Sequence, residues 1–154
     1  MSAADSPSPN DCTMHAFFSS KPIWPSAGLA IVRILTGGFL AYHGRELFDA
    51  ATMKGYVDWD AFKRFSSPAT MVYTGKAMEL VMGVLLMLGL LTRIAALGIV
   101  ITMGYITFFV GHGQVWYSDQ HPFLFVLLAI LFFCCGPGAL SLDALLFSRT
   151  KSRN

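Results

Sequence analysis

A long apolar run that carries one carboxylate constrains this chain more than any other feature of its sequence. Nothing between Leu80 and Leu91 is charged, and a membrane-spanning helix needs about 20 predominantly apolar residues. The helix is therefore predicted to begin near Tyr73, which places Glu79 inside the span. At ~1.5 Å per residue, Glu79 would lie roughly 18 Å from Leu91 and about 12 Å below the opposite membrane surface. A carboxylate at that depth normally faces a bundle interior or a wet cavity, where it has a partner.

Two glycines flank this carboxylate on the same helix face. Gly75 precedes Glu79 by four residues and Gly83 follows it by four, so each lies about one turn away. Small residues in such a row let a neighbouring backbone approach closely. The pattern predicts space for another helix, or for a ligand, directly over Glu79.

The composition agrees with a membrane protein. Hydrophobic residues make up 55% of the chain and charged residues only 13%, which predicts a single integral membrane domain with the lipid bilayer as its main surroundings. The net charge of +2 is too small, and the basic residues too scattered, to indicate nucleic-acid binding. Cys134 and Cys135 would point about 100° apart on a helix, so they are interpreted as apolar filler rather than a redox pair. With Cys12 they provide neither a disulfide framework nor the spacing of a zinc site.

The fold class predicted from hydropathy and turn signals is all-α, a bundle of four transmembrane helices with a short amphipathic interfacial helix in the first loop. The four spans are expected at residues 27–48, 73–91, 94–110 and 123–135. Tyr56, Trp59, Phe62 and Phe65 recur at three-residue intervals and would form one face of the interfacial helix. A disordered tail is expected at residues 1–22, the membrane domain at 23–147 and a basic tail at 148–154.

The distribution of Lys and Arg predicts that both termini are cytoplasmic. The C-terminal tail carries Arg149, Lys151 and Arg153, whereas residues 111–122 contain no Lys or Arg, and cytoplasmic segments are enriched in both. Lys54, Lys63 and Arg64 in the first loop argue the other way.

This topology gathers most of the polar side chains towards the external side. Glu79 and His43 are the candidate catalytic residues, because a carboxylate and a histidine in a low-dielectric pocket place pKa values near neutrality for proton transfer. Candidate ligand-binding residues are Lys76, His112, His121, Trp116 and Tyr117. Quinone reduction needs such groups, since protons are added with the electrons. Quinone is therefore the expected ligand, and no covalently bound cofactor is expected.

Structural interpretations compete with each of these assignments. Glu79 fits a buried ion pair with Lys76 equally well, and His43 could pair with Glu46 three residues later. The residues of the last loop also fit an aromatic belt at the membrane interface. Residue types alone would permit a metal site of His43, Glu79 and His121, but no metal ligand set is assigned. Arg33, Arg93 and Asp143 are interpreted as structural polar residues, with Arg33 either snorkelling to the inner membrane surface or meeting Asp143.

Short motifs in a fixed order resemble the DoxX family of small bacterial membrane proteins. They are Leu29-x-x-x-Arg33 with Gly37-Gly38-Phe39 and His43-Gly44, Gly75-x-x-x-Glu79-Leu80-x-x-Gly83, Leu88-Gly89-Leu90-Leu91-Thr92-Arg93-x-Ala95-Ala96, His121-Pro122, and Gly136-Pro137-Gly138-x-x-Ser141-Leu142-Asp143. The resemblance implies a four-helix domain in the bacterial inner membrane. Some relatives are membrane subunits of oxidoreductase systems, including thiosulfate:quinone oxidoreductase and complexes that handle thiol and oxidative stress. Members often carry a Lys at the position of Leu47, so any role of that Lys does not transfer to this chain.

The sequence therefore predicts a redox-linked membrane subunit that binds quinone or a similar small molecule in an externally open polar pocket. One alternative is a non-enzymatic anchor or assembly factor for a soluble partner protein. A small-solute transporter is the other, although residues 84–91 offer no polar path through the inner half. The substrate, the electron donor and any homo-oligomer are not specified by the sequence.

Overall fold

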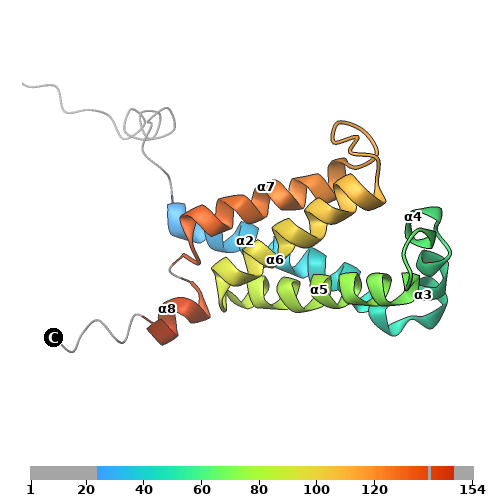
Figure 1. The fold of residues 1–154 in the computed structure, drawn as a ribbon. Coiled ribbons are helices and arrows are strands. Elements are labelled where there is room, and N and C mark those ends of the chain that lie inside the picture. Colours follow the sequence, from blue (N-terminus) through green and yellow to red (C-terminus); the bar gives the residue numbers. More distant parts are fainter. Residues whose placement is uncertain (1–23, 139, 148–154) are drawn as a thin grey trace, which may run out of the picture.

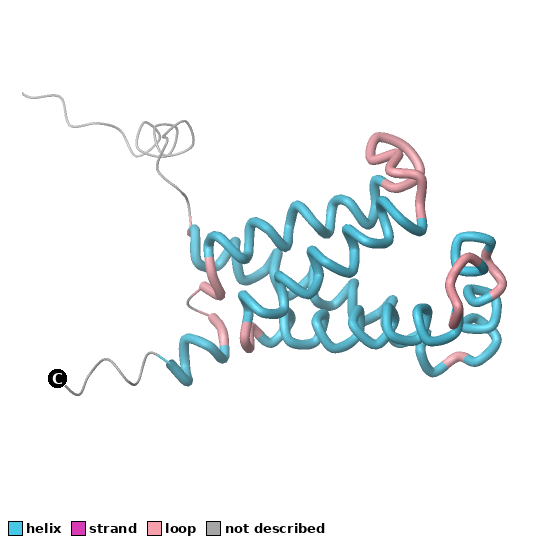
Figure 2. Tube along the Cα trace, in the orientation of Figure 1, coloured by secondary structure: helices cyan, strands magenta, loops and turns pink. Residues whose placement is uncertain are grey.

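The computed structural model describes residues 24–138 and 140–147, which form helices joined by short turns, without a strand among them (Figures 1 and 2). The four longest helices are α2 (Pro25–Gly44), α5 (Pro68–Leu88), α6 (Thr92–Tyr105) and α7 (Gln120–Cys135). The shorter elements are the 3-10 helix η1 (Arg45–Phe48), α3 (Ala50–Val57), α4 (Asp60–Lys63), the π-helix η2 (Ile106–Val110) and α8 (Leu142–Phe147). The tail expected at residues 1–22, Cys12 and the basic tail at 148–154 lie outside the described residues.

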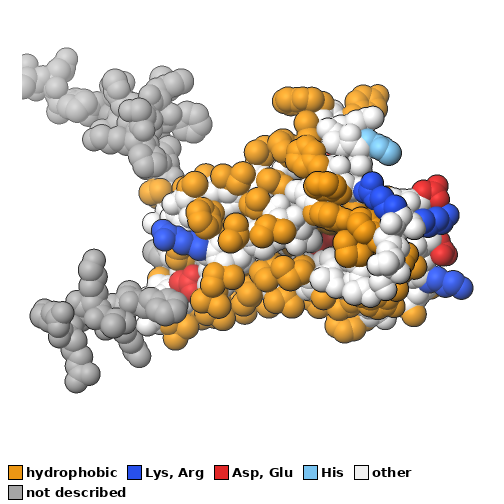
Figure 3. Space-filling model, viewed as in Figure 1, with side chains coloured by type: hydrophobic (Ala, Val, Ile, Leu, Met, Phe, Trp, Pro, Cys, Tyr) orange, Lys and Arg blue, Asp and Glu red, His pale blue; other side chains and the backbone are white. Residues whose placement is uncertain are grey.

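Three helical segments are long and apolar enough to cross a membrane: Pro25–Phe48, Pro68–Leu88 and Thr92–Val110. The fourth, α7, is apolar but has only 16 residues, which at ~1.5 Å per residue corresponds to about 24 Å. Hydrophobic side chains cover the middle of the bundle, and most charged side chains gather at its two ends (Figure 3). The all-α prediction is confirmed and the bundle has the features of a membrane protein, whereas the fourth span remains a prediction.

The helix that carries Glu79 differs in its limits from the prediction. It begins at Pro68 rather than near Tyr73, and it ends at Leu88 rather than Leu91 because Gly89 adopts a left-handed conformation. Leu90 N then donates to Leu85 O, which closes the helix end. Glu79 consequently lies near the middle of α5, roughly 16 Å from its start and roughly 14 Å from its end.

Helices α2 and α5 pack with their backbones in direct contact. A Cβ atom added to Gly37 would collide with the backbone of Met87, and one added to Gly44 would collide with the backbone of Leu80. From the other helix, a Cβ atom on Gly83 would meet Ala41 N at 2.6 Å. Only glycine permits this approach, which fixes the register of α2 against α5. Gly38, the next residue on α2, has more room, since its Cβ would lie 3.9 Å from Met87 Sδ.

At one end of the bundle, buried Arg33 on α2 binds backbone carbonyl groups. Its guanidinium donates to Leu86 O at 2.7 Å, to Met87 O at 3.1 Å and to Leu140 O. These bonds join α2, the end of α5 and the segment before α8. Arg33 is thus held inside the bundle by carbonyl oxygens rather than snorkelling towards a membrane surface, and its role here is structural.

Asp143 on α8 holds the turn between α5 and α6. Its carboxylate accepts hydrogen bonds from Leu91 N at 2.7 Å and Thr92 N at 2.9 Å, while its own backbone N donates to Gly89 O. The carboxylate therefore caps the start of α6, where the helix dipole favours negative charge. Arg93 lies exposed in the first turn of the same helix.

The apolar core lies among α2, α5, α6 and α7, with Leu40 as the buried contribution of α2. Leu86, Ala95, Ala96, Ile99, Ala129 and Phe132 are fully buried there. The first loop folds into two short helices, α3 and α4, rather than one amphipathic helix, and they lie at the end of the bundle opposite α8 (Figure 1). Cys134 and Cys135 at the end of α7 are exposed.

The contact between α2 and α5 predicts a position-dependent response to large side chains. Gly37→Leu must push two backbones apart, which should lower the free energy of unfolding by about 3 kcal/mol or more. Gly28 lies on the same helix and has open space where its Cβ would be, so Gly28→Leu should change it by less than about 0.5 kcal/mol. Thermal melting of both variants in detergent measures the difference, and equal melting temperatures would contradict the packing argument.

Candidate functional site

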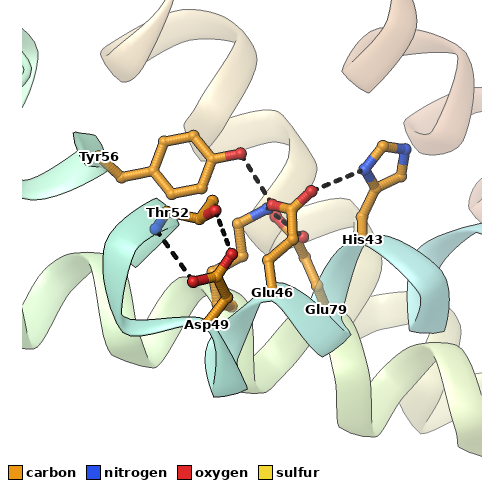
Figure 4. A network of polar contacts seen from close by, with 7 residues as sticks. His43, Glu46, Asp49, Thr52, Tyr56 and Glu79 are labelled. Atoms are coloured by element: carbon orange, nitrogen blue, oxygen red, sulfur yellow. Dashed lines mark hydrogen bonds and ion pairs between the residues drawn. The ribbon is translucent and has the colours of Figure 1, made fainter. Parts of the chain in front are cut away.

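Charged and aromatic side chains from four elements converge on one point of the bundle (Figure 4). His43 comes from the last turn of α2, Glu46 from η1, Tyr56 from α3, and Lys76 and Glu79 from α5. The close approach at Gly44 brings η1 beside α5. The register that the glycines fix therefore determines that Glu46 meets Lys76. These five side chains are called the polar cluster below.

The ammonium group of Lys76 lies between two carboxylates. Its Nζ atom is 2.9 Å from Glu46 Oε2 and 3.0 Å from Glu79 Oε2. Tyr56 donates a hydrogen bond of 2.8 Å to the same Oε2 atom of Glu46, and its ring lies 4.9 Å from Lys76 Nζ. Two carboxylates thus share one ammonium, and such charge-assisted bonds are stronger than neutral ones.

The cluster extends from the interior to the surface. The exposed fraction of the side chain rises from 6% for Glu79 and 14% for Lys76 to 27% for Glu46 and 41% for His43. His43 Nδ1 lies 3.8 Å from Glu46 Oε1, and the His43 ring meets the His121 ring edge-on with centroids 5.6 Å apart. The pairs Lys76–Glu79 and His43–Glu46, expected from their three-residue spacing, are both present at these distances.

Tyr56 is the member of the cluster that lies outside the helices long enough to span a membrane. Partial burial, and then its hydrogen bond to Glu46, raise the pKa of the Tyr56 hydroxyl above its usual range. The hydroxyl therefore keeps its proton and acts as a donor to Glu46. It orients the carboxylate without competing for a proton near neutral pH.

A cavity of about 500 Å³ adjoins the buried end of the cluster. It lies between α3–α4, α5 and α6–η2, and Lys76 and Glu79 are its charged lining residues. Most of its other walls are apolar or aromatic: Tyr56, Trp59, Phe62, Met71, Val72, Met78, Ile101, Tyr105, Ile106 and Val110. Pockets for small organic molecules have this composition, with a few polar groups in an apolar lining.

The two glycines beside Glu79 have different surroundings. Gly83 contacts α2, whereas Gly75 lines the cavity and has no atom within 4 Å of where its Cβ would be. The sequence predicted that these small residues make space for another helix or for a ligand. Gly83 makes space for a helix, and Gly75 leaves open space in the cavity. The π-helix η2 forms part of the opposite wall, and π-turns occur frequently at functional sites.

The structure separates the residues that the sequence placed in one pocket. Glu79 and Lys76 line the cavity, but His43 and His121 line a second depression with Phe39, Tyr42 and Met87. Glu46 lies between the two. The cavity is also largely apolar, so the expectation of one polar pocket around Glu79 and His43 needs correction.

The remaining predicted residues lie in the loop between η2 and α7, away from the cavity lining. Trp116 and Tyr117 are 89% and 84% exposed, and His112 is exposed as well. The carboxylate of Asp119 shapes this loop by accepting hydrogen bonds from His112 N and Gln114 N. Within residues 24–138 and 140–147, no three His, Cys, Asp or Glu side chains are grouped to hold a metal ion.

Sequence reasoning missed two members of the cluster. Glu46 was considered only as a partner for His43, and Tyr56 only as part of an aromatic face. The signal available for Glu46 was a carboxylate near the end of a membrane span, which by itself calls for a partner. No local pattern could have identified Tyr56, because α3 contacts the cluster only after the chain folds back.

Comparison with known proteins finds a family match and a relative. Residues 28–112 match the model of the DoxX family. The chain is also 30% identical over 134 residues to the protein named "Putative oxidoreductase CatD" of Bacillus subtilis (strain 168), a match that covers 82% of this chain and 92% of that protein. No solved structure matches the chain significantly.

The shared ammonium predicts non-additive effects of substitution. Lys76→Met leaves two carboxylates facing each other without their cation, which should lower the free energy of unfolding by about 3–5 kcal/mol. Adding Glu79→Leu removes one uncompensated charge, so the double variant should be more stable than Lys76→Met alone. Thermal melting in detergent of the two single variants and the double variant measures this coupling. Additive losses would show that the cluster does not act as a unit.

Proposed function

Because this chain belongs to the DoxX family, we propose that it is the membrane subunit of a redox system and binds a quinone, or a similar small amphipathic molecule, in the cavity beside Glu79. The observation that carries the proposal is an ion pair, Lys76–Glu79, in the wall of an otherwise apolar cavity. Intramembrane charges are costly and usually functional. The relative named "Putative oxidoreductase CatD" supports the redox assignment.

The lining of the cavity suits the two parts of such a molecule. Aromatic side chains, among them Tyr56, Phe62 and Tyr105, can pack against a flat ring. The Lys76 ammonium can donate a hydrogen bond to a ring carbonyl, since an ammonium carries three donors. Both features favour a ring that carries carbonyl oxygens over a wholly apolar lipid.

The ion pair can also supply the chemistry. Reduction of a quinone to a quinol adds two electrons and two protons. A soluble redox partner protein would supply the electrons, while Glu79 in its protonated form would donate a proton to a carbonyl oxygen. Lys76 would stabilise negative charge that develops on that oxygen before the proton arrives.

A second function is supported by the loop between η2 and α7. Trp116 and Tyr117 are almost fully exposed, and such aromatic residues are enriched where proteins bind one another. The chain would then anchor a soluble partner at the membrane without doing chemistry. In that case, filling the cavity would leave function unchanged, whereas Trp116→Ser with Tyr117→Ser would abolish partner binding.

Filling the cavity tests the proposed ligand site directly. Gly75→Leu projects a side chain into open space, so it should fold normally and weaken binding of decylubiquinone at least about tenfold by occluding the ring site. Trp59 lines the cavity, so quenching of its fluorescence, in a Trp24→Phe, Trp116→Phe background, reports binding.

Glu79→Gln keeps the volume of the side chain but not its titrating proton. This variant should retain a melting temperature near that of the parent while losing quinone-linked activity.

Gly104→Leu is the matched control for the cavity variant. Gly104 is also a helical glycine with no atom within 4 Å of where its Cβ would be, and it does not line the cavity. It should bind decylubiquinone like the parent. Equal binding by the Gly75→Leu and Gly104→Leu variants would overturn the assignment of the ligand to this cavity.

The same proposal places the chain in the bacterial inner membrane with four spans and both termini cytoplasmic. In a background with Cys12, Cys134 and Cys135 replaced by Ala, Ser118→Cys should react with a membrane-impermeant maleimide in intact cells. Ser152→Cys should react only after permeabilisation, because the basic tail favours the cytoplasmic side. Reversed labelling would place both termini outside.

A further inference from the structure

We propose that Glu46 connects the cavity to the protein surface. It passes one proton between His43 and the Lys76–Glu79 pair. The inference deepens the proposed function and rests on it. It assigns a role to the carboxylate that lies between the two depressions. It also assigns a role to His43, which does not line the cavity but would take up the proton at the surface.

The two oxygen atoms of Glu46 face different neighbours (Figure 4). Oε2 lies 2.9 Å from Lys76 Nζ and accepts the Tyr56 hydroxyl, while Oε1 lies 3.8 Å from His43 Nδ1. A single carboxyl group therefore bridges the buried pair and the exposed histidine. The distance to His43 exceeds a hydrogen bond, so transfer requires a small rotation of the imidazole or one bridging water.

The charges in the cluster leave room for one proton. The titratable groups that face Glu46 are His43 from α2, Tyr56 from α3, and Lys76 and Glu79 from α5. With both carboxylates ionised, Lys76 protonated and His43 neutral, the formal charge is −2 + 1 = −1. An uncompensated charge in a low-dielectric interior is unfavourable. Binding one proton makes the cluster neutral, so it is suited to store a proton.

The proposed transfer conserves atoms and charge. Protonated Glu79 donates its proton to a carbonyl oxygen of the reduced quinone, so its O–H bond breaks and a new one forms on the ligand. His43 then takes up a proton from a hydronium ion at the surface and passes it to the ionised Glu46. Lys76 gives a proton to the ionised Glu79 and receives the proton held by Glu46, which restores the cluster with one stored proton. The soluble redox partner named above supplies the electrons.

A purely structural role for Glu46 is the competing explanation. By accepting from Tyr56, Glu46 also fixes α3 against the bundle. Stability measurements alone therefore cannot test the proposal. The decisive quantity is the rate at which the buried carboxyl group gains its proton, which a structural role would leave unchanged.

Time-resolved infrared spectroscopy after a jump to lower pH measures that rate on the full chain in detergent. The band of the protonated carboxyl group should appear in the parent and be absent from Glu79→Gln, which assigns it. Glu46→Gln keeps hydrogen bonds to Tyr56 and Lys76 but cannot carry a proton, so the band should appear at least about tenfold more slowly. Glu46→Asp, which restores a titratable group, should recover part of the rate.

Two further variants complete the test. His43→Gln interrupts the same path at its exposed end, so it should also slow protonation and remains informative if Glu46→Gln does not fold. Asp60→Asn removes an exposed carboxylate that pairs with Lys63 on α4, and it should protonate at the parental rate. A parental rate in either Glu46→Gln or His43→Gln would overturn the path.

The two proposals fail in different ways. Absence of decylubiquinone binding by the parent would overturn the proposed ligand and, with it, the quinone as the proton acceptor. Normal binding with unchanged protonation in Glu46→Gln would overturn only the role of Glu46. In that event Glu46 would serve to hold α3 in place.

Discussion

The sharing of one ammonium by two carboxylates determines how this bundle is organised around its centre. Lys76 and Glu79 belong to the same helix, so their pairing does not depend on how α5 packs against its neighbours. Glu46 reaches Lys76 only if α2 and α5 pack in one particular register. Gly37, Gly44 and Gly83 impose that register by allowing backbone contact. An interaction that stabilises charge in a low-dielectric environment thus depends on the absence of three side chains. A change in the packing of α2 against α5 would therefore also change the electrostatic stabilisation of Lys76 by Glu46.

The two ends of the bundle are held by different kinds of bond. At the α8 end, Arg33 binds carbonyl groups in the last turn of α5 and Asp143 binds amide groups at the start of α6, so their effect does not depend on the side chains there. At the other end, the polar cluster binds through side chains whose protonation can change. The two ends of the bundle therefore carry different sets of polar residues. One set fixes the scaffold, and the other provides titratable groups.

Much of this arrangement was predictable from the sequence, and the rest depends on folding over distance. Hydropathy located the helices, glycine spacing located the contact at Gly83, and the interval from Lys76 to Glu79 indicated their pairing. The N-terminal limit of α5 was missed because a span of about 20 residues counted back from Leu91 reaches only to about Tyr73, whereas the helix runs from Pro68 to Leu88. The role of Tyr56 depends on where a surface helix folds back, and the separation of His43 from the cavity depends on which side of α2 each residue faces. No local pattern contains that information.

The packing of the helices divides the bundle into two pairs. Helices α2 and α5 make the most extensive contact, α6 and α7 make the next, and α2 and α7 barely meet. The cavity lies along the seam between these pairs, with α5 on one side and α6–η2 on the other. A molecule that occupies it would touch both pairs at once and would set the spacing between them. The loop that carries Trp116 and Tyr117 joins α6 and α7. A molecule in the cavity would therefore change the position of this exposed loop, which is open to a partner.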